Sequence, residues 1–392
     1  MNQTLNILIL GKDPTLFAST PGTTQDTRKR HIAYAEVLRR KYPNSEVRII
    51  TYTPASQPIQ TEQVSEGLRI YGTGSIHRAT YLFGILKRLP KVLAKGWRPD
   101  VVTVQTPWEE GSFGYIIARL LKAKYLPQLH CDPFTEAWKK EHWLNPWRRI
   151  VAFWLLKHAD RIRTDSNELR EKVIKQLGIS AEKVQTAALA VVNFHPVSGL
   201  KSDFKKKIAP VLETKKIVLF VGLFYAPKNL KLWVEAAEQI SQQVSEVAFV
   251  MAGNGPLFND IQLLVQQKKL TEQFYFLGSV GYEKLPEIYA AADVFLLSSN
   301  YESFGRVILE AYMAGVPVVS TAGVGPKDQI EHGTTGFLVP VGDSRAISDG
   351  VVNLLQDDDL RRRFGKMGQE KMMTQFSKEA MSEKVVATWE NA

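Results

Sequence analysis

The chain contains a single cysteine, Cys131, among its 392 residues. An intrachain disulfide is therefore excluded, and such sparse cysteine is typical of proteins from a reducing compartment. No apolar run approaches the ~20 residues needed to cross a bilayer. The apolar run at 5–10 is too short for a secretory signal and has no basic residue before it. We expect a cytoplasmic protein, either free or peripheral on the inner face of the cell membrane.

Metal-ligand spacings and nucleic-acid-binding modules are also lacking. His130, Cys131 and Asp132 stand together, but on a strand Cys131 would point away from its neighbours, so we expect no zinc there. The acidic triplet at 357–359 lies between two helical segments, and we interpret it as a helix N-cap with surface charge. The sequence contains no recognised nucleic-acid-binding module, and we expect no nucleic-acid partner.

The net charge of +10 is unevenly distributed. Residues 1–200 hold 29 of the 50 Lys and Arg residues but only 17 of the 40 Asp and Glu residues. Half of the eight tryptophans lie at 138–163 among basic residues. Basic residues with interfacial aromatics favour peripheral contact with an anionic membrane. A core-packed helix with a solvated basic face is the alternative.

Short apolar runs rich in Val, Ile and Leu alternate with helical patterns throughout the chain. This alternation predicts an α/β protein with two Rossmann-like domains, each a parallel sheet covered by helices on both faces. A turn-rich, lysine-rich stretch near 193–215 separates the two series and is interpreted as the interdomain linker. The predicted strands are 5–10, 47–51, 68–71, 101–105, 125–130, 161–165 and 184–188, then 217–221, 247–252, 274–277, 294–298, 318–321 and 337–340.

The most informative stretch is 298–320, where a strand ends near Ser299 and a helix begins near Gly305. Ligands bind at the carboxyl ends of strands in such sheets, and N–H groups at a helix N-terminus can hold a phosphate. Glu302 precedes the helix, and Glu310 lies about five to six residues into it. Two carboxylates about two turns apart are well placed to accept hydrogen bonds from sugar or ribose hydroxyls.

Glu302 and Glu310 with their seven intervening residues resemble the E-x7-E motif of family 4 retaining glycosyltransferases, the group 1 type with the GT-B fold. The flanking segments 291–299, 314–319 and 336–339 resemble the same donor-site core. The resemblance implies two Rossmann-like domains facing a cleft, at 1–197 on the acceptor side and at 198–371 on the nucleotide-sugar side. It also implies that a C-terminal helix at about 372–392 packs back on the first domain.

The resemblance assigns roles around the helix N-terminus. Glu302 is expected to bind hydroxyls of the transferred sugar, and Glu310 to bind the ribose. Backbone N–H groups are expected to bind the donor sugar and its phosphates, and Ser303 lies within this segment. The residues implied to offer these groups are Phe304, Gly305, Val307 and Ile308.

A second part of the implied donor site follows the strand at 217–221. Gly222 and Lys228 match the family pattern G-R-L-x-x-x-K-G, and a lysine is a point charge suited to a diphosphate. The chain departs from the pattern at Leu223, where arginine is usual, and at Asn229, where glycine is usual. The loops that carry Asn254 and Val280 are expected near the nucleotide base.

In the first half, His130 follows a strand, and the family often has a histidine there that contacts the donor sugar near the reacting centre. With Lys228 and Glu302, it forms the expected catalytic set. Gly22, in the long loop after the first strand, is the candidate for close backbone approach to the donor phosphates.

The implied activity is retaining transfer of a hexose from a UDP- or GDP-sugar to a glycan or lipid-linked saccharide in cell-surface polysaccharide assembly. The family generally uses no metal or cofactor. A non-catalytic sugar-nucleotide-binding protein, or an epimerase or phosphorylase of the same fold, stays open as an alternative. A nicotinamide-dependent dehydrogenase is disfavoured because the turn at 252–257 lacks the third small residue of the dinucleotide fingerprint.

Overall fold

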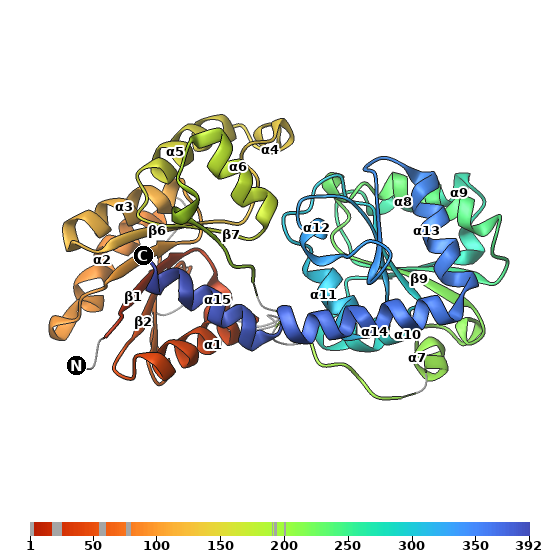
Figure 1. Cartoon of the computed structure of the whole chain (residues 1–392), viewed down its shortest axis with the longest axis horizontal. Helices are drawn as coiled ribbons and strands as arrows, with labels where there is room; N and C mark the ends of the chain where they lie inside the picture. The colour runs from red at the N-terminus through yellow and green to blue at the C-terminus, as the bar shows by residue number, and fades with distance from the viewer. Residues whose placement is uncertain are drawn as a thin grey trace. The chain divides into compact units, whose positions relative to one another are not determined.

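The computed structural model describes residues 4–17, 26–54, 60–75, 80–189, 191, 194–199 and 201–392. The chain forms two compact units, each with its own sheet (Figure 1). Unit 1 comprises Met1–Val192 together with Lys378–Ala392, and unit 2 comprises Asn193–Ser377. Among the described residues, no helix has the length and apolar character required to span a bilayer.

Unit 1 contains an eight-stranded sheet in the order β3-β4-β2-β1-β5-β6-β7-β8. Every pairing is parallel except that of β3 with β4. The predicted strands of this half are all present, and β3 is an additional edge strand that the sequence did not indicate. The strands are β1 (Ile7–Gly11), β2 (Val47–Thr51), β3 (Thr61–Ser65), β4 (Leu68–Gly72), β5 (Val101–Val104), β6 (Lys124–Leu129), β7 (Ile162–Thr164) and β8 (Val184–Thr186).

Successive strand residues point to opposite sides of this sheet, so apolar side chains lie on both faces, and helices cover both. Ile7 and Ile9 pack with one hydrophobic cluster and Leu8 and Leu10 with another. The first face is covered by α1 (Asp26–Lys41) and α15 (Lys378–Glu390), which contact each other. The other face is covered by α2 (Tyr81–Val92), α3 (Glu109–Leu121), α5 (Asn145–Lys157) and α6 (Asn167–Leu177), while the short α4 (Glu136–Glu141) packs on α5.

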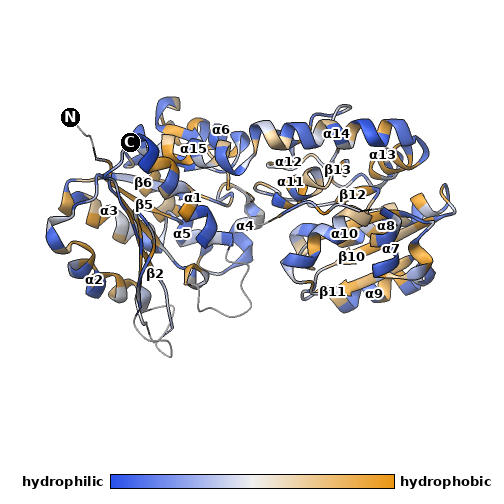
Figure 2. Ribbon diagram, turned by 90° about the horizontal axis from the view of Figure 1, so that it is seen from below, coloured by the Kyte–Doolittle hydropathy of each residue, from blue (hydrophilic) through white to orange (hydrophobic). Residues whose placement is uncertain are grey.

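Unit 2 contains a six-stranded, fully parallel sheet in the order β11-β10-β9-β12-β13-β14. Figure 2 shows β10 in the colour of hydrophobic residues, as expected of a strand buried on both faces. The strand order reverses between β9 and β12, and in open α/β sheets ligands bind at such a switch point. The strands are β9 (Lys216–Val221), β10 (Val247–Ala252), β11 (Phe274–Gly278), β12 (Val294–Leu297), β13 (Val318–Thr321) and β14 (Gly336–Val339).

The helices of unit 2 follow its strands in the expected alternation. The long α14 ends at Gln375, and α15 of unit 1 begins at Lys378, so the predicted helical tail is two helices. The helices are α7 (Lys201–Ile208), α8 (Leu230–Ser241), α9 (Phe258–Gln267), α10 (Leu285–Ala291), α11 (Arg306–Met313), α12 (Pro326–Gln329), α13 (Ser344–Gln356) and α14 (Asp358–Gln375).

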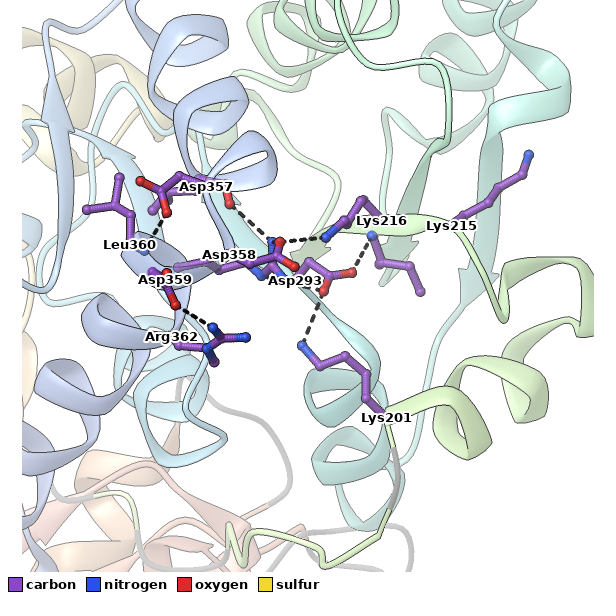
Figure 3. A network of polar contacts seen from close by, with 12 residues as sticks. Lys201, Lys215, Lys216, Asp293, Asp357, Asp358, Asp359, Leu360 and Arg362 are labelled. Carbon is purple, nitrogen blue, oxygen red and sulfur yellow. Dashed lines mark hydrogen bonds and ion pairs between the residues drawn. The ribbon is translucent and has the colours of Figure 1, made fainter.

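A buried carboxylate joins α7 to the sheet at the start of β12 (Figure 3). Asp293 accepts a hydrogen bond from the Ile217 N–H at 2.8 Å and lies 3.0 Å from Lys205 Nζ and 3.3 Å from Lys201 Nζ. Burial alone would raise the pKa of Asp293, but the two ammonium groups and the N–H outweigh it, so the pKa is lowered. The charged form of Asp293 therefore stabilises this corner of unit 2.

The acidic triplet at 357–359 begins α14, away from the strand ends that bind ligands. The Asp357 carboxylate accepts a hydrogen bond from the Leu360 N–H at 2.8 Å, which confirms the predicted N-cap (Figure 3). Asp358 lies 2.8 Å from Lys216 Nζ and also pairs with Arg361. The triplet thus serves helix capping and surface ion pairs.

Candidate functional site

The loops that follow β9, β10 and β11 are tied together by backbone hydrogen bonds. The Gly222 N–H donates to Ala252 O at 3.0 Å, and the Gly253 N–H donates to Gly278 O at 2.7 Å. Gly253 has φ +142°, and an added Cβ would overlap the carbonyl oxygen of Gly222. Only glycine therefore allows these loops to approach so closely.

A cavity of about 240 Å³ lies between these loops, at the carboxyl edge of the sheet. It brings together three of the residues predicted to bind the donor: Gly222, Asn254 and Val280. Leu223, in the position where arginine was expected, also lines it and is 64% exposed. The full lining is Val221, Gly222, Leu223, Ala252, Gly253, Asn254, Ser279, Val280 and Leu285.

Lys228 and Glu302, both predicted, form an ion pair across the switch point between β9 and β12. Their side chains are 13% and 14% exposed, so water screens the pair only partly. The Ser298 hydroxyl donates to the carbonyl oxygens of Lys228 at 2.9 Å and Asn229 at 3.1 Å. The end of β12 thereby fixes the backbone that carries the lysine.

The Glu302 loop enters α11 through Gly305, which has φ +87° and occupies the N-cap. Glycine adopts this left-handed conformation without the steric cost of a Cβ. A second loop supports it, because the Gly325 N–H donates to Glu302 O at 2.8 Å and the Gln329 side chain donates to Phe304 O. These two hydrogen bonds therefore stabilise the conformation of the predicted segment 302–305.

The first turn of α11 contains Val307 and Ile308, whose N–H groups were predicted to bind phosphate. The Ile308 N–H already donates to Gly305 O at 2.9 Å. Val307 lies one residue nearer the N-terminus, where a helix offers no intrahelical acceptor. The positive end of the helix dipole at this turn favours an anion. Ser303 lies in the same loop and is half-buried.

Glu310 is buried on α11 and accepts hydrogen bonds from two tyrosines. The Tyr289 hydroxyl lies 3.0 Å and the Tyr282 hydroxyl 3.2 Å from its oxygens. Burial, and then the negative charge of Glu310, raises the pKa of Tyr289 well above its usual value. Tyr289 therefore stays protonated and donates to the carboxylate. The sequence did not lead us to expect a role for either tyrosine. Tyr282 lies shortly before α10 and Tyr289 lies within it.

In unit 1, His130 lies directly after β6 and lines a separate cavity of about 270 Å³. Its Nδ1 is 2.8 Å from the Asp165 carboxylate and its Nε2 is 3.2 Å from Gln128 Oε1. The Gln128 oxygen also accepts from the buried Arg163 at 2.9 Å, which fixes the orientation of its amide. Asp165 was not among the predicted site residues. Its position at the end of the predicted strand at 161–165, which pairs with β6, could have indicated that it lies near His130.

The remaining residues of unit 1 that the sequence analysis considered are Cys131 and Asp132, which follow His130, and Gly22. Asp132 is fully buried and lies 2.7 Å from Lys172 Nζ. Burial, reinforced by the negative charge of Asp132, raises the pKa of the Cys131 thiol to about 12. Within the described ranges, no group of three or more His, Cys, Asp and Glu side chains could hold a metal ion. Gly22 falls in the segment 18–25, outside the described residues.

Two protein-family models match the chain, and between them they span most of it. The model described as "Glycosyl transferases group 1" matches residues 201–371, which contain Lys228, Glu302 and Glu310. The model described as "Glycosyl transferase 4-like domain" matches residues 32–189, which contain His130. The boundary between the two matches falls where one sheet ends and the other begins.

Individual relatives agree with these matches. The N-acetyl-alpha-D-glucosaminyl L-malate synthase of Bacillus anthracis is 35% identical over 185 residues, which is 47% of each chain. The alpha-D-kanosaminyltransferase of Streptomyces kanamyceticus is 27% identical over 264 residues, covering 65% of this chain and 67% of that enzyme. The chain thus spans about half the length of the first relative and two thirds of the second.

The fold is that of the GT-B glycosyltransferases. Anabaena HepE, solved in complex with UDP and glucose, superposes with a TM-score of 0.76 at 18% identity, covering 99% of this chain and 100% of that one. At this identity the likeness establishes the fold alone. The two family matches and the named relatives show that the chain belongs to the group 1 glycosyltransferases, a family of transferase enzymes.

Proposed function

We propose that the chain is a retaining hexosyltransferase. Its donor is a UDP- or GDP-hexose, and its acceptor is a glycan or a lipid-linked saccharide in cell-surface polysaccharide assembly. The Lys228–Glu302 ion pair is the observation that carries this proposal. A cation and a carboxylate meet there at the switch point of the sheet, beside the N-terminus of an eight-residue helix.

The leaving group of the transfer is a nucleoside diphosphate, on which negative charge develops. Lys228 supplies a positive charge for it, and the first turn of α11 supplies N–H groups and the positive end of a helix dipole. Glu302 exchanges its contact with Lys228 for hydroxyls of the donor sugar. Glu310, held by Tyr289 and Tyr282, accepts hydrogen bonds from the ribose. The base occupies the cavity lined by Asn254 and Val280.

Leu223 distinguishes this site from the family pattern, in which an arginine would add a second cation. We assign the diphosphate to Lys228 and backbone N–H groups, with no metal ion required. His130 contacts the donor sugar near the reacting carbon, oriented by Asp165. Retention follows from front-face attack assisted by the leaving phosphate, the mechanism that the family resemblance implies.

The distribution of charge along the chain supports the proposed acceptor. The names of the two relatives describe transfer of an N-acetylglucosaminyl group, with L-malate as the acceptor, and transfer of a kanosaminyl group. The cationic first half favours an anionic acceptor, and a diphosphate-linked lipid saccharide provides one. Such an acceptor places the enzyme peripherally on the inner face of the cell membrane.

A transfer assay tests the proposal. Purified enzyme is incubated with UDP- and GDP-hexoses, with and without lipid-linked saccharides, and released nucleotide is measured together with the anomeric configuration of the product by NMR. We expect acceptor-dependent release with one donor and retained configuration. Lys228→Met should lower kcat by about 10²-fold or more, whereas Lys231→Met, an exposed lysine on α8, should not change it. Nucleotide release that is equal in both variants, or an inverted product, would contradict the proposal.

A further inference from the structure

The outer surface of three neighbouring helices in unit 1 is unusually apolar. α3 contacts both α2 and α5, so the three helices form one layer over the sheet (Figure 1). Tyr115 of α3 and Trp154 of α5 pack edge to face at 5.3 Å, which makes this layer continuous. We call its exposed apolar surface the α2–α3–α5 face: Phe83, Leu86, Ile116, Leu120, Trp147, Ile150, Val151 and Trp154.

These side chains are exposed because they lie on the outer face of regular helices, and not because the helix ends are unwound. On α5, Trp147, Ile150, Val151 and Trp154 recur at the spacing of one helix face, while Ala152, Leu155 and Leu156 face the core. The same division holds on α3, where Ile117 and Ala118 are buried between the exposed Ile116 and Leu120. Each helix therefore has two apolar faces, and only one of them is needed for the fold.

Several side chains of this face are mostly exposed. Leu120 is 76%, Trp147 68% and Phe83 66% exposed. Trp143, in the turn before α5, is 79% exposed and extends the set. Isolated exposed hydrophobic residues are ordinary, but a concentration of them on helices that contact one another favours an interaction surface.

The charge around this face identifies the kind of partner. The helices α2, α3 and α5 contain seven Lys and Arg residues but only two acids, Glu109 and Glu110, neither of which is exposed. Lys87, Lys91 and Lys157 are exposed and form no ion pair with the described residues. A face with apolar side chains, tryptophans and unpaired cations matches an anionic lipid surface. A second copy of this chain fits poorly, because a two-fold contact would bring cations against cations.

We propose that the α2–α3–α5 face docks on the surface of an anionic lipid bilayer, with its tryptophan, leucine and phenylalanine side chains inserted among the lipid headgroups. The proposal extends the proposed use of a lipid-linked acceptor, but its support is independent of that chemistry. It also assigns the lipid-binding charge to lysines other than the paired arginines within the basic segment at 138–163. Arg148 pairs with Glu109 and Arg149 with Glu136, so neither charge is available in full to the membrane.

Vesicle co-sedimentation of the full chain tests the proposal. The probes are vesicles of phosphatidylcholine alone and vesicles of phosphatidylcholine mixed with phosphatidylglycerol. We expect binding to the anionic vesicles that weakens with salt. Leu120→Ser combined with Trp147→Ser should weaken that binding by roughly tenfold or more, since the double variant removes apolar surface that the bilayer would bury. The matched control is Leu263→Ser, which alters a 54% exposed leucine on α9 of unit 2 and should bind like the wild type.

Charge is tested separately with Lys87→Glu and Lys157→Glu, which break no ion pair of the described residues. These variants should reduce binding to anionic vesicles and leave the weak binding to phosphatidylcholine unchanged. The proposal would be overturned if the wild-type protein did not bind anionic vesicles. It would also be overturned if the Leu120→Ser/Trp147→Ser protein bound them as the wild type does. A wild-type dimer that the same double variant converts to monomer would assign the face to self-association instead.

Nucleotide-sugar binding, measured without vesicles, separates this proposal from the proposed function. The double variant alters only exposed residues of unit 1 and should retain the wild-type affinity for the donor. Loss of vesicle binding with retained donor binding supports docking through this face. Vesicle binding by a protein that binds no nucleotide sugar would leave the docking face in place and refute the donor site.

Discussion

Replacement of Asp293 by asparagine should destabilise unit 2 without touching the donor site. The carboxylate is 3% exposed and faces Lys205 at 3.0 Å and Lys201 at 3.3 Å (Figure 3). Asparagine keeps an oxygen for the Ile217 N–H but removes the charge, which leaves a buried ammonium group uncompensated. Breaking a buried pair in this way costs about 3–5 kcal/mol, and we expect the lower end because one hydrogen bond survives.

Scanning calorimetry measures this loss. For a unit of this size, about 3 kcal/mol corresponds to a decrease of roughly 6–12 °C in Tm. Asp358→Asn is the matched control, since it removes a carboxylate from the same network at a position that is 53% exposed. Exposed pairs contribute about 0–1 kcal/mol, so its Tm should fall by no more than about 4 °C. Equal Tm decreases in the two variants would refute the reasoning.

The pH dependence gives an independent check. The pKa of Asp293 is lowered in the folded chain, so its stabilising effect is complete above the usual aspartate pKa of about 3.9. The effect is lost as the pH falls through the lowered folded-state pKa. The Tm difference between wild type and Asp293→Asn should therefore be constant from neutral pH to about pH 5 and shrink below about pH 4. A difference that grows on acidification would contradict the assignment.

Three further predictions concern individual side chains. Tyr289→Phe removes the hydroxyl 3.0 Å from Glu310 and should weaken calorimetric nucleotide binding severalfold while lowering stability by about 1 kcal/mol; unchanged affinity would argue against a donor role for Glu310. The Cys131 thiol, whose pKa is raised to about 12, should hold roughly a thousandfold less thiolate than a free cysteine and react far more slowly with Ellman's reagent in the native chain than after unfolding, although the residue is partly exposed; equal labelling rates before and after unfolding would contradict the raised pKa. Asp165→Asn removes the carboxylate 2.8 Å from His130 Nδ1 and should lower kcat by up to about 10²-fold, with a smaller change in KM for the donor and an altered pH–rate profile; a change in stability alone would reduce Asp165 to a structural role.

The sheets were predictable because their strands are buried and strongly apolar. β3 escaped prediction since its sequence, Thr-Glu-Gln-Val-Ser, is polar and lies at the sheet edge, where one side is left to solvent. The break between α14 and α15 was also missed. Apolar spacing continues across it through the buried Met372, Phe376 and Met381, so periodicity alone carries no sign of the break.

Parts of the candidate site depend on contacts between strands that are distant in sequence. The order of β9 and β12 in the sheet brings Lys228 to Glu302, and the motif predicted both residues without predicting their ion pair. Asp165 reaches His130 because β6 and β7 are adjacent and in register, which no local pattern encodes. The segment at 291–299 was interpreted as part of the donor-site core, yet Asp293 lies at the opposite end of β12 from the ligand-binding edge and stabilises the fold.

The central claim is that unit 2 binds a nucleotide sugar around Lys228, Glu302 and Glu310. Isothermal titration calorimetry with UDP-, GDP- and ADP-sugars tests it most directly, with Glu310→Ala as the site variant and Glu331→Ala, an exposed glutamate of the same unit, as the control. The account predicts that one nucleotide binds to the wild type and to Glu331→Ala but not measurably to Glu310→Ala. No binding of any nucleotide sugar to the wild type, or equal binding to both variants, would contradict it.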